Sequence, residues 1–118
     1  MDDCIFCKIV SAEIKTEFLF ESDQVVAFRD IRPIAPAHVL IIPKEHFESM
    51  NDLTENHKGL LGEMFLAAVK IAKDLNIAPD GYKLLIRTGP NGGQEVPHVH
   101  LHLIGGAKLS EGIRPIQS

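Results

Sequence analysis

The chain has 118 residues, of which 45% are hydrophobic, and a net charge of −4, so we predict one domain over residues 1–118. It has no Lys/Arg run, which argues against nucleic acid as a partner because duplex binding relies on clustered phosphate contacts. Asp2 and Asp3 stand where a signal peptide would carry basic residues, and no apolar stretch approaches the ~18 residues of a membrane span. We therefore expect a cytoplasmic protein without a membrane segment.

The first half of the chain predicts a short helix and three strands. The short helix covers residues 4–12, and paired strands follow at residues 17–21 and 25–29. An apolar run at residues 38–42 stops at Pro43, which predicts a buried strand.

The second half predicts one long helix followed by two strands. Asp52 or Thr54 can cap a helix that extends to about residue 76, in which apolar residues recur every three or four positions. Residues 82–88 and 98–104 form the last two strands. Because strands outnumber helices and follow one another at hairpin-like spacing, we predict an α+β fold. It consists of an antiparallel five-stranded sheet with one long and one short helix, both on one side.

Three histidines, His98, His100 and His102, occupy alternate positions of the last predicted strand. Alternate side chains of a strand lie on one face, about 6.6 Å apart, while the apolar residues between them point to the core. An imidazole with an ordinary pKa near 6.5 can attack, accept a proton or donate one at pH 7, so the row predicts a reaction centre. The alternative is a strand with a polar, wet face, for which Thr, Lys or Glu would serve equally.

The loop before this strand, residues 89–97, contains the adjacent glycines Gly92 and Gly93. Such a pair allows left-handed backbone conformations in which successive amides converge on an anion. Since the loop leads directly into the histidine row, an anion held there would lie beside His100. An ordinary long hairpin loop remains the alternative.

Taken together, these motifs resemble the histidine-triad family, and within it the Hint branch. The resemblance covers nearly the whole chain, from the Cys4-x-x-Cys7 segment through residues 27–31, 36–46 and 92–96 to the triad, which two apolar residues follow. It implies a histidine-triad fold whose sheet extends across a homodimer. It also implies hydrolysis of purine nucleoside phosphoramidates or related nucleotidyl adducts at the α-phosphate.

The resemblance also implies a role for individual residues. His100 would attack the α-phosphorus, His102 would protonate the leaving amine, and His38 would support the triad without a catalytic metal. The loop amides around Gly93, Gln94, Glu95 and Val96 would bind the α-phosphate.

A second group of residues would hold the nucleoside. Asp30 matches the family's ligand of the ribose hydroxyls, and Phe6, Phe28 and Ile31 match positions that enclose the base. Without the resemblance, Asp30 is typical of a turn or cap, and the apolar residues are typical of plain core.

Three features depart from the Hint pattern. Arg87 stands where the family usually carries Asn, and its guanidinium could clamp the phosphate or fill the pocket. The chain has no Trp, and its tail over residues 108–118 differs from the Trp-Pro-Pro tail of many Hint proteins. Glu95 replaces a Ser that is common in animal members.

The cysteines predict a separate metal site. Cys4 and Cys7, with His46 and His98, match the two thiolates and two imidazoles through which some histidine-triad proteins bind a structural zinc ion. A redox pair and two small core thiols are the alternatives.

Other functions remain open at this stage. A metallohydrolase could use two of the triad histidines as zinc ligands, and a nucleotide-binding regulator would not need His100 as a nucleophile. A dinucleoside polyphosphate hydrolase is the alternative within the same chemistry. Apolar residues on more than one stripe of the long helix, including Phe65 and Leu66, favour a homodimer.

Overall fold

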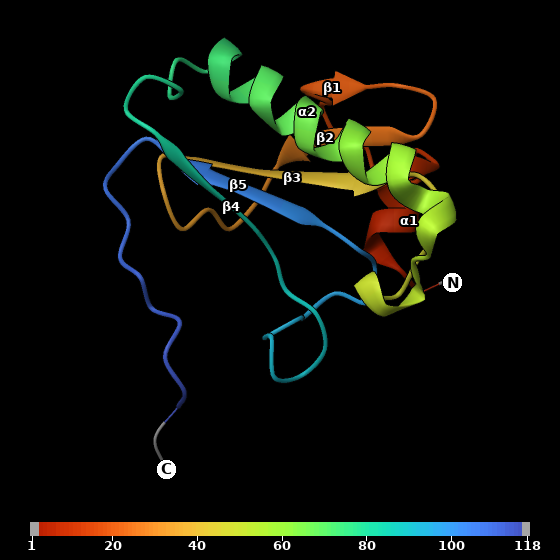
Figure 1. The fold of residues 1–118 in the computed structure, drawn as a ribbon. Coiled ribbons are helices and arrows are strands. Elements are labelled where there is room, and N and C mark those ends of the chain that lie inside the picture. Colours follow the sequence, from red (N-terminus) through yellow and green to blue (C-terminus); the bar gives the residue numbers. More distant parts are fainter. Residues whose placement is uncertain (1–2, 117–118) are drawn as a thin grey trace.

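A five-stranded antiparallel sheet forms the centre of the computed structural model, which describes residues 3–116 (Figure 1). The strand order is β1-β2-β3-β5-β4. This confirms the predicted α+β fold; residues 1–2 and 117–118 of the predicted domain lie outside the described residues. The elements are α1 (Ile5–Val10), β1 (Phe20–Glu21), β2 (Val25–Arg29), β3 (Ala37–Pro43), α2 (Lys58–Asp74), β4 (Tyr82–Ile86) and β5 (Leu101–Gly105).

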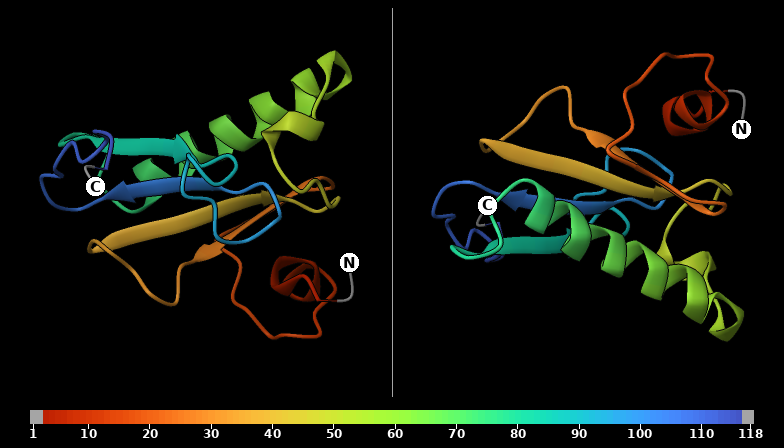
Figure 2. Two further views of the ribbon diagram at one scale, coloured as in Figure 1. Left: turned by 90° about the horizontal axis from the view of Figure 1, so that it is seen from below. Right: turned by 90° about the horizontal axis from the view of Figure 1, so that it is seen from above.

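The two helices cover opposite faces of the sheet, so the prediction that both lie on one side was wrong (Figure 2). Val25, Ala27 and Val39 pack with α2, whereas the residues between them, Val26 and Phe28, pack with α1. The sequence signal for this arrangement is the uninterrupted apolar run at residues 39–42, which is typical of a strand covered on both faces. All seven residues of β3 are buried, which requires cover on both faces.

The long helix begins later than predicted because two short 3₁₀ helices, Met50–Asp52 and Glu55–His57, precede it. Thr54 does act as a cap, but its hydroxyl accepts from Asn56 N–H in the second 3₁₀ helix rather than in α2. In the described part of the chain no helix is long and apolar enough to cross a membrane.

The last strand also begins later than predicted, at Leu101 rather than at residue 98. The ladder with β3 ends at the pair Leu101 and Ile41, and two residues further along β3 Pro43 would lie opposite Val99. Proline has no N–H to donate, and the Pro43 carbonyl lies 2.9 Å from Nε2 of His98 instead. Val99 N–H donates to Phe47 O, so this segment approaches the sheet without joining it.

Candidate active site

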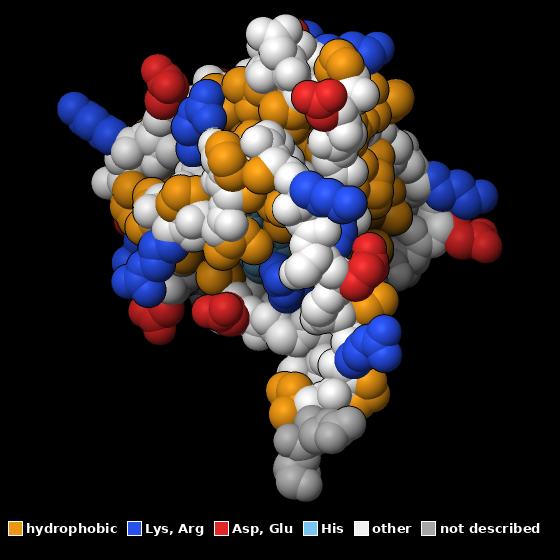
Figure 3. Space-filling view, turned by 90° about the vertical axis from the view of Figure 1, so that its left-hand side faces the viewer, with side chains coloured by type: hydrophobic (Ala, Val, Ile, Leu, Met, Phe, Trp, Pro, Cys, Tyr) orange, Lys and Arg blue, Asp and Glu red, His pale blue; other side chains and the backbone are white. Residues whose placement is uncertain are grey.

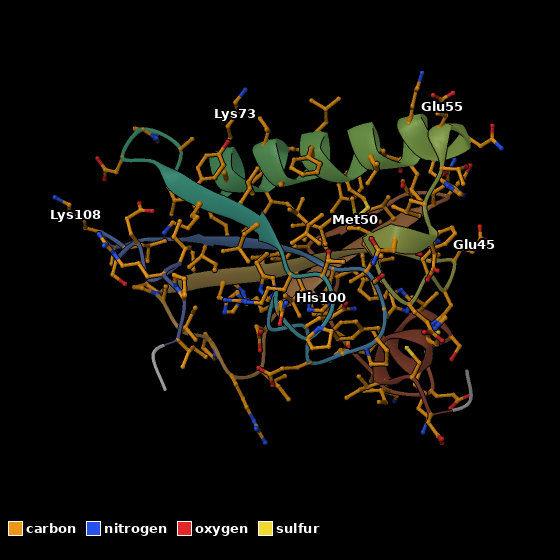
Figure 4. All side chains as sticks on the ribbon, turned by 60° about the horizontal axis from the view of Figure 1, so that its bottom comes forward. Glu45, Met50, Glu55, Lys73, His100 and Lys108 are labelled. Carbon is orange, nitrogen blue, oxygen red and sulfur yellow. The ribbon has the colours of Figure 1, made fainter. Side chains whose placement is uncertain are left out.

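The three triad histidines are buried on the face of the sheet that α1 covers. His98, His100 and His102 are 0%, 6% and 6% exposed, while Val99, Leu101 and Leu103 between and beyond them pack into the core under α2. Figure 4 shows His100 beneath the sheet, on the side away from α2. The ring centres of His100 and His102 are 4.9 Å apart, closer than the predicted 6.6 Å, and the two ring planes make an angle of 57°.

A hydrogen bond to the backbone fixes the tautomer of His100. Its Nδ1 lies 2.7 Å from the carbonyl oxygen of His98. A carbonyl only accepts, so Nδ1 carries the proton and Nε2 keeps a lone pair. In the neutral ring the nucleophilic nitrogen is therefore Nε2.

His38 and His102 are linked in a chain that begins at the backbone. Ile34 N–H donates to Nδ1 of His38, whose Nε2 lies 3.0 Å from Nδ1 of His102. His38 therefore carries its proton on Nε2 and donates to His102, which leaves the proton of His102 on its own Nε2. That atom also lies 3.2 Å from Nη1 of Arg87.

Burial keeps these rings neutral at pH 7. It lowers the pKa of both His38 and His100, and for each ring the nearby Arg87 guanidinium lowers it further. Burial, then the neighbouring His100 and Arg87, lower the pKa of His102 to about 3. A neutral His100 is the form that can act as a nucleophile.

The loop over residues 89–97 is held by the side chain of Gln94. Gln94 accepts from Gly89 N–H and donates to the carbonyls of Glu48 and Val96. The amides of Gly93 and Gln94 are used in turns within the loop. Among the described residues, the loop amides of Asn91, Glu95 and Val96 have no protein acceptor. Glu95 and Val96 directly precede the triad segment in the chain, so their amides are the donors available to an anion beside it.

The predicted nucleoside residues differ in their exposure. Asp30 is half-buried; one carboxylate oxygen accepts from Arg32 N–H as in a turn, and the other lies 3.5 Å from Nε2 of His38. Phe6 and Phe28 are buried and pack edge to face against each other. Phe6 packs in the same way against His100, with the ring centres 5.1 Å apart. Ile31, by contrast, is 87% exposed.

The four predicted metal ligands converge on one point. The Cys4 Sγ–His98 Nδ1, Cys7 Sγ–His46 Nδ1 and His46 Nδ1–His98 Nδ1 distances are 3.3, 3.2 and 3.2 Å. A tetrahedral zinc ion separates thiolate and imidazole ligands by roughly 3.3 to 3.8 Å. The spacing therefore fits one ion bound by all four atoms.

Hydrogen bonding and charge support the same donor set. Nε2 of His98 faces the Pro43 carbonyl and carries the proton, so Nδ1 presents its lone pair to the cysteines. Burial and the neighbouring Cys4 raise the pKa of Cys7 to about 11, so a bound cation is what would hold its thiolate at pH 7.

Ligand-type atoms of Asp30, His38 and His102 also lie within 4.8 Å of one another. Here, however, Nε2 of His38 carries a proton, because its Nδ1 accepts from a backbone N–H. This group is thus a hydrogen-bonded chain rather than a set of free lone pairs, which disfavours a catalytic metal between the triad and Asp30.

Comparisons with known proteins agree with this geometry. The HIT domain profile matches residues 11–109. The chain belongs to the HIT domain family. It is 49% identical to "Protein HitA" of Neisseria gonorrhoeae over 105 residues, which cover 89% of this chain and 97% of the relative. It is 46% identical to "Purine nucleoside phosphoramidase" of Escherichia coli K12 over 108 residues, which cover 92% of this chain and 91% of the relative.

A solved structure of a HIT family protein also matches the chain. The HIT family hydrolase from Legionella pneumophila Philadelphia 1 superposes with a TM-score of 0.91 at 42% identity, covering 95% of this chain and 100% of that one. Because relatives at this level of similarity carry hydrolase names, we assign this HIT chain to the hydrolases.

Some residues that shape the site escaped the sequence analysis. Ile34 and Pro43 set the tautomers of His38 and His98 through backbone groups, which no side-chain pattern reveals. Glu48 anchors the loop through its carbonyl in the same way.

Proposed function

We propose that this HIT-family hydrolase cleaves purine nucleoside phosphoramidates or related nucleotidyl adducts through a nucleotidyl-histidine intermediate. The observation that carries the proposal is the 2.7 Å hydrogen bond between Nδ1 of His100 and the His98 carbonyl. It leaves the lone pair of the neutral ring on Nε2. The activity in the name of the Escherichia coli relative supports the same substrate class.

The reaction takes place in two displacements. Nε2 of His100 attacks the α-phosphorus and the bond from phosphorus to the leaving nitrogen breaks. The amine takes a proton from the imidazolium form of His102, which the negative charge of the bound substrate favours. Water then attacks the same phosphorus, the bond to His100 breaks, and His102 accepts the proton of the water. The amides of Glu95 and Val96 stabilise charge on the phosphoryl oxygens throughout.

The remaining residues bind and orient the substrate. The carboxylate of Asp30 accepts from the ribose hydroxyls, and His38 orients His102 at 3.0 Å. Phe6 and Phe28 form the apolar wall behind the base, and the exposed Ile31 closes over it as the nucleotide binds.

A turnover screen tests this proposal. Adenosine and guanosine phosphoramidates are compared with dinucleoside polyphosphates, each with the wild-type chain and with His100→Ala. We expect hydrolysis of phosphoramidates by the wild type, and no turnover but continued AMP binding by His100→Ala. Substantial activity in His100→Ala would exclude the covalent route. A non-catalytic regulator would instead bind AMP and turn over none of the substrates.

The Cys4, Cys7, His46 and His98 group is proposed to hold one structural zinc ion. With all four positions filled by protein, no open site is left for water, so the ion would join α1 to the start of the triad and take no part in the reaction. Elemental analysis of untagged protein should give about one zinc per chain. A ratio near zero with both thiols freely titratable would leave two core cysteines.

We further propose a single HIT domain over the whole chain, a cytoplasmic location and a homodimer. Leu66 is 70% and Phe65 is 40% exposed on α2, and every residue of the edge strand β4 is only half-buried. A second copy placed against α2 and β4 would cover these residues and extend the sheet. Sedimentation at micromolar concentration should show twice the 13.0 kDa chain mass. A monomer would contradict the dimer.

Nucleic acid is not among the proposed partners. The face shown in Figure 3 carries positive and negative side chains interspersed, without a basic stripe. Such a surface offers no row of phosphate contacts. A dinucleoside polyphosphate hydrolase remains the second candidate function, favoured by the position of Arg87 beside His102.

A further inference from the structure

Arg87 points into the active site without a partner anion. It follows β4, in which Leu85 pairs with His102, and its side chain runs along the loop, where a Cβ on Gly93 would lie 3.5 Å from its Cδ. The residue is half-buried, and in the described part of the chain no ion pair joins it to a carboxylate. A partly desolvated guanidinium of this kind is stabilised when a ligand supplies negative charge.

Its contact with His102 is not an ordinary hydrogen bond. Since His38 donates to Nδ1 of His102, the proton of His102 lies on Nε2. Arginine has only donors, so two N–H groups face each other across 3.2 Å. An oxygen of an anionic group would accept from both and relieve this opposition.

The position of the contact between Arg87 and His102 indicates which part of the substrate Arg87 would bind. In an in-line displacement the leaving atom departs on the side of the phosphorus opposite His100, where His102 meets it. The non-bridging oxygens of the α-phosphate face the amides of Glu95 and Val96 instead. Arg87 therefore lies next to the leaving group.

We infer that Arg87 selects nucleotidyl adducts whose leaving group carries a negative charge next to the scissile bond. The inference rests on the proposed function, because attack by His100 defines which side the leaving group occupies. As the bond to phosphorus breaks, its electron pair passes to the leaving group, and a guanidinium stabilises that charge. A neutral amine gains nothing from Arg87 and needs a proton from His102.

Two kinds of leaving group share this chemistry. A phosphate chain departs as an anion and needs no proton, whereas an amine that bears a carboxylate takes one proton from His102 while its carboxylate pairs with Arg87.

A matched pair of substrates tests the inference. The adenosine phosphoramidates of alanine and of alaninamide differ in the carboxylate, and diadenosine tetraphosphate represents the phosphate chain. We compare kcat/KM of the wild type with that of Arg87→Gln. The ratio of alanine to alaninamide adduct should fall by about tenfold or more in Arg87→Gln, since a charge-assisted pair is lost. Intrinsic differences between the two amines cancel in this comparison.

A control variant separates charge in the site from charge elsewhere. Lys73→Gln removes the same charge from the exposed surface of α2, on the other side of the sheet from His100 (Figure 4). It should keep the wild-type ratio. Arg87→Lys, which retains the charge but not the planar fork, should restore part of the preference.

The outcomes are distinguishable. If Arg87→Gln changes only the ratio of kcat/KM for the alanine pair, the leaving group is a carboxylate-bearing amine. If Arg87→Gln lowers kcat/KM only for diadenosine tetraphosphate, the leaving group is a phosphate chain. Either result supports the inference. Full turnover with no dependence on Arg87 in both arms would overturn it while leaving the proposed function intact. If neither the wild type nor Arg87→Gln turned over any of the three substrates, the proposed function itself would fail.

Discussion

The buried ring of His102 makes the stability of the protein depend on pH. Its pKa is about 3 in the folded chain, chiefly through burial, against 6.5 in an unfolded chain. Between pH 6.5 and pH 3 the unfolded state therefore binds a proton at this ring and the folded state does not. The contribution of the ring to the free energy of unfolding is fully present above pH 6.5 and is lost as the pH falls toward 3. Replacing this ring by Gln should remove that dependence.

The magnitude follows from the two pKa values. Each pH unit between them changes the free energy of unfolding by about 1.4 kcal/mol. Between pH 7 and pH 4.5 the contribution of this one ring amounts to about 2 to 3 kcal/mol. Over this interval wild type should lose that much more stability than His102→Gln, whose amide can still accept from Nε2 of His38.

Urea unfolding of both proteins at the two pH values measures the difference. Both carry the same Cys/His cluster, so proton uptake there cancels, and the slope of free energy against urea should be equal for the pair. Parallel losses of stability in wild type and His102→Gln would contradict the reasoning. They would mean that the ring takes up its proton in the folded state as easily as in the unfolded one.

Three further predictions concern the loop, the metal cluster and the helix surface. A Cβ on Gly92 would lie 2.5 Å from the Thr88 carbonyl oxygen, so Gly92→Ala should distort the loop and weaken AMP binding by about tenfold; unchanged affinity would show that the loop does not bind phosphate. Chelation should lower the Tm by roughly 5 °C or more but spare the initial rate of folded protein, whereas a proportional loss of rate would point to a catalytic metal. Leu66→Glu should convert the dimer to a monomer in sedimentation, and an unchanged dimer would place the interface elsewhere.

Periodicity was sufficient to predict the elements that a regular hydrophobic pattern defines. The long helix and the strands around residues 25–29 and 38–42 are present, because alternate or three-to-four spacing follows directly from backbone geometry. The ends of elements depend on contacts from distant parts of the chain. β5 begins at Leu101 because Pro43, far away in sequence, cannot continue the ladder.

The candidate site shows the same division. Side chains with a distinctive chemistry, such as the triad and the Cys/His cluster, could be selected from their spacing, and the structure brings each set together. The protonation states could not be predicted, since they depend on the His98 carbonyl and the Ile34 amide. The contact of Arg87 with His102 arises from the pairing of β4 with β5, a register that no local motif specifies.

Covalent attachment of AMP to His100 during turnover tests the central claim most directly. Wild-type protein is mixed rapidly with an adenosine phosphoramidate, quenched in alkaline denaturant because a phosphorus–imidazole bond is acid-labile, and mapped by peptide mass spectrometry. The account predicts one AMP on the peptide that contains His100, attached at the Nε2 side and formed at least as fast as kcat. Turnover without an adduct, or an adduct on His98 or His102, would contradict it.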